Sequence, residues 1–151
     1  LVNNAGAFIQ DDLLTEPDGT LEKLLDINLM SAYHLSRALV PLMLEQGRGH
    51  LFNICSVASK QAFPRSGSYT VSKFAVLGLT KALRMELMDK NIKVTAILPG
   101  ATYTSSWEGA DIKAQRLIAP EDIARAVLGA WELGPSATVE EIVIRPQLGD
   151  L

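Results

Sequence analysis

One pattern constrains the fold of this chain more than any other: short apolar runs alternate with longer segments whose apolar residues recur at helical spacing. The expected strands lie at residues 1–2, 50–55, 92–98 and 139–144, and the expected helices at 20–46, 68–89 and about 120–133. Strands that alternate with helices build βαβ units, in which the strands lie parallel. The 151 residues are enough for one domain with its own core. We therefore expect a single α/β domain over 1–151 with a doubly wound parallel sheet.

Local signals predict where the helices end and where the chain is irregular. Asp18-Gly19-Thr20 precedes the first helix and makes Thr20 a candidate N-cap. Pro41 is expected to kink or split that helix, and Gly47 to end it. Residues 101–119 show little apolar periodicity, so we expect a mobile loop there, in which Trp107 either covers a substrate or packs on its own segment.

Composition argues against several classes of function. A net charge of −3 and a pI of about 5.4 give no basis for binding nucleic acid or an anionic membrane. The chain contains no uncharged apolar run of about 18 residues, so no membrane-spanning helix is expected. The single cysteine, Cys55, excludes an internal disulfide, fits a reducing compartment such as the cytoplasm, and is expected to be a buried packing residue. His34 and His50 have no partner at metal-ligand spacing, so we expect no metal site.

The strongest chemical signal is the pair Tyr69 and Lys73, four residues apart on an expected helix. At this spacing the two side chains share one helix face. A phenol has an ordinary pKa of about 10, and a neighbouring ammonium group lowers it, so the pair can act as a general acid and base on an alcohol or a carbonyl. The alternative is a solvated helix face. Ser56 lies thirteen residues before Tyr69 at the end of an expected strand, where ligands bind in such sheets; it either holds a substrate oxygen or caps the loop.

Three further features accompany this pair. Asn28 lies in the middle of an expected helix, where asparagine is unfavourable; it is either a surface residue or an amide that disturbs the helix and holds a water. The small residues of Asn3-Asn4-Ala5-Gly6 follow the first strand and let the backbone approach a flat ligand. Pro99-Gly100 follows the third strand, with Thr104 shortly after. Each of these two segments, taken alone, is an ordinary turn.

In this order and at these spacings, the motifs closely resemble the classical short-chain dehydrogenase/reductase family over residues 1 to about 150. The resemblance implies a Rossmann-type fold and hydride transfer between NAD or NADP and a small carbonyl compound or secondary alcohol. It implies proton transfer by Tyr69, orientation of the substrate oxygen by Ser56, ribose binding by Lys73, and a relay water on Asn28. It also implies that the nicotinamide cofactor contacts the following residues in addition to Tyr69 and Lys73: Asn3, Ala5, Gly6, Pro99, Gly100, Thr102 and Thr104.

One departure from the family is large. Its members carry a glycine-rich turn between the first strand and first helix that holds the pyrophosphate, and no G-x-x-x-G-x-G occurs here. Leu1-Val2 reads as the end of a strand, so the chain resembles the C-terminal three-fifths of a member, and we expect the earlier strands of the sheet to be absent from it. Two alternatives to an active enzyme remain: an inert relative that binds a nucleotide or a protein, and an inactive fragment.

The two long helices, 20–46 and 68–89, carry more apolar residues than one buried stripe requires. The surplus comprises Leu35, Leu39, Met43, Leu77, Leu83 and Leu87. Members of the family that this chain resembles pair these two helices across a two-fold axis. The resemblance therefore implies a homodimer or homotetramer that assembles through both helices.

Overall fold

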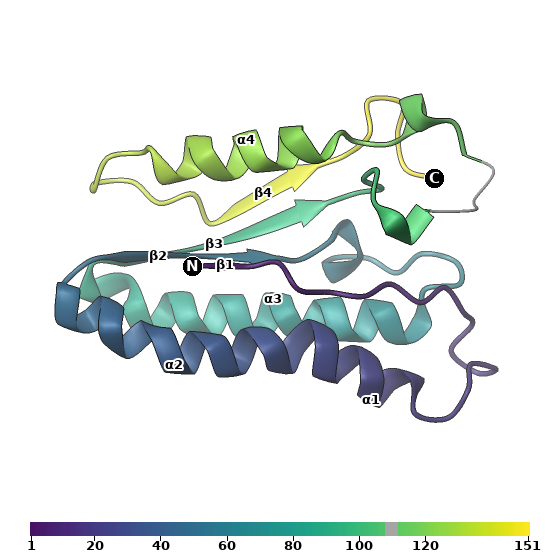
Figure 1. Ribbon diagram of the computed structural model, residues 1–151, viewed down its shortest axis with the longest axis horizontal. Coiled ribbons are helices and arrows are strands. Elements are labelled where there is room, and N and C mark those ends of the chain that lie inside the picture. Colours follow the sequence, from purple (N-terminus) through teal and green to yellow (C-terminus); the bar gives the residue numbers. More distant parts are fainter. Residues whose placement is uncertain (108–111) are drawn as a thin grey trace.

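The computed structural model describes residues 1–107 and 112–151. Its sheet has four strands in the order β1 (Val2–Asn3), β2 (Gly49–Ile54), β3 (Ile92–Pro99) and β4 (Glu141–Ile144). All neighbouring strands are parallel, with Val2 opposite Phe52 and Ile97 opposite Ile54 on one side and Ile142 on the other. Parallel strands place their carboxyl ends at one edge, and the arrows in Figure 1 all point to that edge. The predicted parallel sheet is confirmed.

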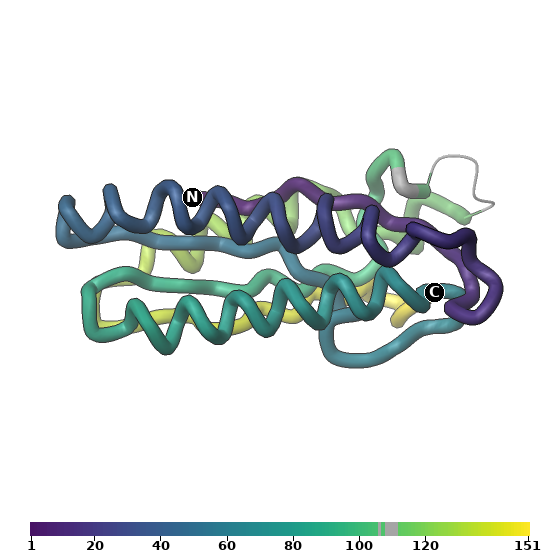
Figure 2. Tube along the Cα trace, turned by 90° about the horizontal axis from the view of Figure 1, so that it is seen from below, coloured from purple at the N-terminus to yellow at the C-terminus, as the bar shows by residue number. Residues whose placement is uncertain are grey.

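Helices cover both faces of this sheet, as expected for a doubly wound fold. They are α1 (Thr20–Leu25), α2 (Ser31–Gln46), α3 (Gly67–Leu87) and α4 (Pro120–Trp131). The first three lie on one face and α4 lies on the other, so the molecule has three layers (Figure 1). Seen from the helix side, α2 and α3 run side by side along the sheet (Figure 2). Short 3₁₀ turns lie at Val57–Ser59, Met88–Lys90, Ser105–Trp107 and Ala114–Arg116.

The first long helix differs from the sequence prediction at its N-cap and at Pro41. Gly19 is the N-cap of α1, whereas Thr20 is its first helical residue and donates to Pro17 O at 2.7 Å. The helix does not split at Pro41, because α2 continues through it to Gln46 and ends at Gly47, whose φ of 67° is the left-handed conformation that glycine adopts readily. The irregularity lies earlier, in a π-helical turn over Asp26–Met30 that contains Asn28.

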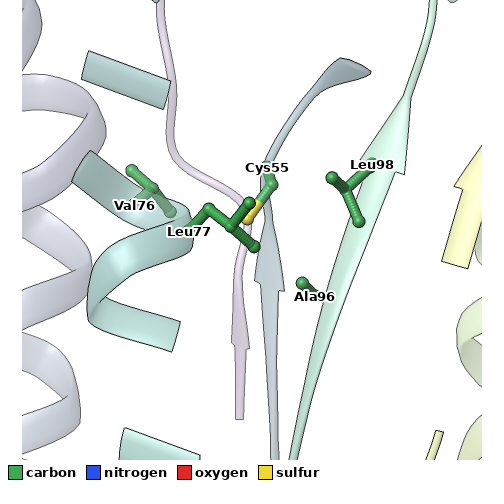
Figure 3. Packing of buried hydrophobic residues seen from close by; sticks show 5 residues of the cluster. All are labelled: Cys55, Val76, Leu77, Ala96 and Leu98. Carbon is green, nitrogen blue, oxygen red and sulfur yellow. The ribbon is translucent and has the colours of Figure 1, made fainter. Parts of the chain in front are cut away.

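The core lies on both faces of the central strands. Beneath β2 and β3, five buried residues form one cluster: Cys55, Val76, Leu77, Ala96 and Leu98. Figure 3 shows the Leu77 side chain of α3 next to the Cys55 sulfur, with Ala96 and Leu98 on the neighbouring strand β3. Cys55 is therefore the buried packing residue that the sequence predicted, and burial raises the pKa of its thiol.

The same packing corrects the residues predicted for a subunit interface. Leu77 and Leu87 are only 7% and 4% exposed, because the stripe of α3 that carries them faces the sheet. Met43 and Leu83 pack against a second buried cluster around Leu51 and Val94. Four of the six predicted interface residues thus pack against the core. Of the six, Leu35 is exposed, and further apolar side chains of α2 and α3 also face outward, among them Leu42, Val71 and Phe74.

Two further observations apply to the described residues. Among residues 1–107 and 112–151, no helix is both long and apolar enough to cross a membrane. Within the same ranges, no group of three or more His, Cys, Asp or Glu side chains is placed to hold a metal ion.

Candidate active site

A cavity opens at the carboxyl ends of β1, β2 and β3, where the sequence predicted the functional residues to meet. Residues from the loops after these strands and from the first turns of α3 line it. Eight of the predicted residues are among them: Gly6, Ser56, Tyr69, Lys73, Pro99, Gly100, Thr102 and Thr104. These residues are up to 98 positions apart in sequence, and the parallel sheet brings them to one edge.

Tyr69 and Lys73 occupy successive turns at the start of α3 and share one face, as their spacing predicts. The Lys73 ammonium lies 5.8 Å from the centroid of the Tyr69 ring. Lys73 is only 5% exposed, and its Nζ donates to Ile54 O of β2 at 3.1 Å. Among the described residues no carboxylate pairs with this ammonium group, and burying an unpaired charge is costly, so Lys73 stays a candidate functional residue. The solvated-face alternative does not apply to it.

The pKa directions in this cavity differ from the sequence-based expectation. Burial raises the pKa of the Tyr69 phenol above its ordinary value, while the Ser56 side chain acts in the opposite direction by hydrogen bonding. Burial also lowers the pKa of Lys73. The expected net depression of the Tyr69 pKa by Lys73 is therefore wrong for this structure, because removing the phenolate from water has the larger effect.

Ser56 is held rigidly at the end of β2. It caps the 3₁₀ turn Val57–Ser59: its Oγ accepts from Ala58 N at 3.1 Å, and its own N–H donates to Ser59 Oγ at 3.2 Å. This reciprocal pair is a capping box, which satisfies two backbone donors. The capping role and the proposed substrate-binding role are thus compatible, because the cap fixes the Ser56 hydroxyl at the wall of the cavity.

Asn28 lies behind the cavity wall, 2% exposed, and its amide ties two elements together. Its Oδ1 accepts from Ala7 N at 2.7 Å, and its Nδ2 donates to Ala7 O at 3.1 Å and to Ser72 Oγ at 2.9 Å. The amide therefore connects the loop after β1 to α3. The predicted disturbance of the helix is present as the π-helical turn, and the relay water stays a prediction.

The Asn3-Asn4-Ala5-Gly6 segment divides between two roles. Asn4 and Gly6 line the cavity, whereas Asn3 and Ala5 are not among its lining residues. The Asn3 amide instead lies in a buried polar network, where its Nδ2 donates to Asn53 Oδ1 at 2.7 Å and to Ser36 Oγ at 3.1 Å. Binding of a cofactor by Asn3 and Ala5 remains a prediction.

The loop after β3 is anchored at its base. Gly100 N donates to Ile144 O at 2.7 Å, and Thr102 forms a bridge with Ile118. A Cβ at Gly100 would lie 3.0 Å from Pro146 Cδ, so glycine permits this close approach. Trp107 lines the cavity, which agrees with the substrate-covering alternative; the mobility predicted for 101–119 stays a prediction, and residues 108–111 lie outside the described residues.

Sequence reasoning missed the aromatic part of the wall. The Phe8 ring packs edge-on against the Tyr69 ring with centroids 4.8 Å apart, and it lies 6.1 Å from Trp107. Asn4, Ala7 and Phe63 also line the cavity. The available signal was position: Phe8 follows a small-residue turn at the end of a strand, where a large apolar side chain is exposed to any ligand.

Comparisons with known proteins agree with this geometry. The family model described as short chain dehydrogenase matches residues 1–114. The chain is 43% identical to the sepiapterin reductase of Chlorobaculum tepidum over 100% of its own length and 62% of that protein. It is 32% identical to an uncharacterized oxidoreductase of Staphylococcus saprophyticus, over 97% of the chain and 62% of the relative. The chain thus spans about three fifths of the length of these curated relatives.

Solved structures give the same result. A 4-hydroxyisoleucine dehydrogenase complexed with NADH superimposes with a TM-score of 0.83 at 30% identity, over 96% of this chain and 66% of that one. ElxO with NADP bound superimposes with a TM-score of 0.86 at 28% identity, over 96% of this chain and 64% of that one. The predicted Rossmann-type α/β fold is confirmed by these neighbours, and with the family match over three quarters of its length the chain belongs to the short-chain dehydrogenase family.

Proposed function

We propose that the intact protein transfers a hydride between NAD or NADP and a carbonyl compound or secondary alcohol. The observation that carries this proposal is the meeting of Ser56, Tyr69 and Lys73 in one cavity at the carboxyl ends of the strands. Family membership supports it, and so do the names of the relatives, which are reductases and dehydrogenases. Neighbours were solved with NADH and with NADP, so the proposal covers both cofactors.

The residues present fit the nicotinamide side of such a cofactor. A Cβ at Gly6 would lie 3.4 Å from Asn28 Oδ1 and 3.5 Å from Lys73 Nζ, so a side chain there would fill the space above these two polar atoms. Glycine keeps it open for a flat ligand. Within the described part of the chain, one N–H of Lys73 donates to Ile54 O, which leaves donors for the hydroxyl groups of a ribose.

Each side chain then has a distinct task at the substrate oxygen. The bound nicotinamide supplies or accepts the hydride. The Ser56 hydroxyl, fixed by its capping box, holds the oxygen of the substrate. The Tyr69 hydroxyl donates a proton to that oxygen during reduction and removes it during oxidation. Lys73 stabilises the phenolate that remains, because its ammonium group lies beside the ring.

The raised pKa of Tyr69 adds a direction to this scheme. A phenol with a raised pKa stays protonated at neutral pH, and the protonated form is the one that donates. The phenol of the unliganded site is therefore in the form that donates to a carbonyl oxygen near pH 7. Oxidation of the alcohol requires the phenolate and should increase as the pH rises toward the pKa of Tyr69.

The predicted partners remain part of this proposal. The substrate is a small carbonyl or alcohol, and the expected compartment is the cytoplasm. Assembly into a homodimer or homotetramer through α2 and α3 would cover Leu35, Leu42, Val71 and Phe74, which are exposed here. Light scattering of the intact protein at micromolar concentration tests this: a dimer or tetramer supports the proposal, and a clean monomer contradicts it.

The decisive test of the function is Tyr69→Phe in the intact protein, with Tyr33→Phe as the matched control. Tyr33 also carries a phenol, but it lies on α2, where its hydroxyl accepts from Arg37 at 2.8 Å. Turnover of NADH and NADPH is measured with a panel of ketones and aldehydes, and cofactor binding by fluorescence. We expect Tyr69→Phe to lower kcat by about 10²–10⁴-fold, which is typical of acid–base catalysis, and to leave cofactor affinity nearly unchanged.

Tyr33→Phe should retain full activity. If Tyr69→Phe kept more than about a tenth of the wild-type kcat, Tyr69 would not be the proton donor. If the wild-type protein bound cofactor tightly but turned over none of the panel, a nucleotide-binding relative without activity would replace the proposed enzyme.

A further inference from the structure

The loop after β1 does more than line the cavity, because it also crosses the start of α3. We name residues 7–16 the strap. It contacts three consecutive residues at the start of α3: Ser66, which precedes the helix, and Gly67 and Ser68, its first two residues. Asp11 forms a parallel bridge with Ser66, and Asp11 O accepts from Gly67 N at 3.3 Å. The Glu16 carboxylate accepts a hydrogen bond from the Ser68 hydroxyl. Tyr69 is the next residue along the helix.

The surroundings of Gly67 show how closely the strap packs against the start of α3. A Cβ at this position would lie 2.7 Å from Leu13 Cβ, 2.8 Å from Leu13 Cα and 2.9 Å from Leu13 N. Two of these three atoms are backbone atoms, so rotation of a side chain cannot relieve the contact. Gly67 does not have a positive φ. Glycine destabilises a helix by roughly 1 kcal/mol relative to alanine. The close approach of Leu13, which leaves no room for a Cβ, explains why glycine occupies position 67.

The Glu16–Ser68 hydrogen bond fixes the same turn from a second direction. Ser68 is completely buried, so its hydroxyl requires a partner inside the protein. The acceptor is Glu16 of the strap, whose carboxylate lies beside the first turn of α3, a helix of 21 residues, where the helix dipole favours a negative charge. The strap therefore holds α3 by a steric contact at one residue and a charge-assisted hydrogen bond at the next.

The strap also contacts the machinery itself. Ala7 is bound at both its N–H and its carbonyl by Asn28, and the Phe8 ring packs against the Tyr69 ring. Because a helix is stiff over one turn, a shift at Gly67 moves the Tyr69 hydroxyl with it. A misplacement of about 1 Å can lower a rate by about 10²-fold.

From these contacts we infer that the strap is a positioning device, in which Leu13 against Gly67 and Glu16 against Ser68 set the distance of the Tyr69 hydroxyl from Ser56. This inference rests on the proposed function, since it assigns the strap a role in the same proton transfer. Gly67, Ser68 and Glu16 are positioning residues and act through Tyr69.

The test compares Gly67→Ala with Gly78→Ala in the intact protein. Gly78 lies on the same helix, and a Cβ there would have no heavy atom within 4 Å. Position is read by NMR of the protein labelled at the tyrosine ¹³Cζ, with the Tyr69 signal assigned by its loss in Tyr69→Phe. We expect Gly67→Ala to move the Tyr69 signal and its titration midpoint, and Gly78→Ala to leave both in place.

Kinetics give the second measurement. Gly67→Ala should lower kcat at least about tenfold while KM and cofactor affinity stay within about twofold. Gly78→Ala should leave all three constants within that range. Glu16→Ala should lower kcat as well, and Glu16→Gln, which keeps an acceptor oxygen, should restore most of it.

The possible outcomes distinguish a failure of the positioning role from a failure of the proposed function. If the Tyr69 signal does not move in Gly67→Ala, the positioning role is overturned. It is also overturned if kcat, cofactor affinity and the thermal midpoint all decrease together, because that pattern indicates general damage to the fold. If Gly67→Ala moves the Tyr69 signal but the wild-type protein turns over no carbonyl or alcohol, the strap positions Tyr69 and the proposed function fails.

Discussion

Helices α3 and α4 lie on opposite faces of the same sheet, and they bury different kinds of side chain (Figure 1). Four polar or charged residues of α3 are buried: Ser68, Ser72, Lys73 and Thr80. In α4 the one buried residue is Ala130, whereas Leu128 and Trp131 are 51% and 62% exposed. Helix α4 thus leaves large apolar side chains in contact with solvent, whereas the buried face of α3 combines these polar groups with Val76, Leu77 and Leu87.

The difference agrees with our proposal that α3 carries the chemistry. Burying a polar group costs free energy unless it is hydrogen-bonded, and α3 meets this requirement at each position. Ser72 Oγ donates to Tyr69 O at 2.7 Å and accepts from Asn28, and Thr80 Oγ1 donates to Val76 O at 2.7 Å. A helix that only covered a sheet would not need this network. Helix α4 covers the sheet by ordinary amphipathic packing, whereas we propose that α3 also positions the reactive groups.

The largest effect should come from Lys73→Met, compared with Lys23→Met on the exposed surface of α1. In the intact protein, we expect Lys73→Met to lower kcat by about 10²-fold or more and to weaken cofactor binding, because the buried ammonium group serves both. Burial lowers the pKa of Lys73, so the buried charge costs free energy that partly offsets the hydrogen bond from its Nζ to Ile54 O, and its removal should change the thermal midpoint only slightly. Enzyme kinetics, cofactor titration and calorimetry measure the three effects.

Lys23→Met should change none of the three. A Lys73→Met protein that is less stable yet fully active would reverse the assignment, and would make α3 a structural helix like α4.

The next effect concerns packing. Leu77→Ala on α3 should lower the free energy of unfolding by about 2–5 kcal/mol, because a buried leucine leaves a cavity when it is truncated. Leu128→Ala on α4 should change it by no more than about 0.5 kcal/mol, since this side chain is half exposed. Urea unfolding of the intact protein measures both. Equal losses would mean that α4 is covered in solution, and the contrast between the helices would disappear.

A smaller effect should follow from Thr80→Val, which keeps the shape of the side chain and removes the hydroxyl. Thr80 Oγ1 accepts from Asn53 Nδ2 at 2.8 Å, and Asn53 is fully buried. Loss of this acceptor should cost about 1–3 kcal/mol in the free energy of unfolding. Thr15→Val, on the exposed loop before α1, is the control and should cost nothing measurable. If Thr80→Val is neutral, the polar network of α3 contributes no stability.

The smallest effect should be a pH-dependent one at Glu141, the first residue of β4. Lys60 and Lys81 lie beside Glu141 of β4 and hold the pKa of its carboxylate below the ordinary value of 4.5. Because the folded state lowers this pKa, the carboxylate stabilises the fold above pH 4.5, and the contribution is lost as the pH falls through the lower folded value. Glu141→Gln should therefore cost about 0.5–1 kcal/mol at pH 7 and nothing at about pH 2–3.

Unfolding curves of the wild type and Glu141→Gln at both pH values measure this contribution. An equal difference at the two pH values would show that the ion pairs of Glu141 contribute nothing, and that the residue acts only through its packing.

The sequence was sufficient for the order of the elements and for most of the site. The alternation of short apolar runs with segments of helical periodicity predicted all four strands and the helices between them. The predicted ends of these elements differ from the observed ends by a few residues at most. The spacing of Tyr69 and Lys73, with Ser56 at a strand end, predicted that these three side chains meet. Both results have the same cause: a helix period and a strand end are local properties, and a parallel sheet places all of its carboxyl ends at one edge.

Other features of this protein were decided only by the tertiary structure, because they depend on how segments distant in the sequence pack together. It turned Leu77 and Leu87 toward the sheet rather than toward a second subunit, and it placed the Asn3 amide in a buried network. It raised the pKa of Tyr69, because desolvation by surrounding elements exceeds the hydrogen bond from Ser56. It also brought Leu13 against Gly67, a contact between residues 54 positions apart. No local pattern encodes burial or a long-range contact, since both depend on which surfaces meet when the chain folds.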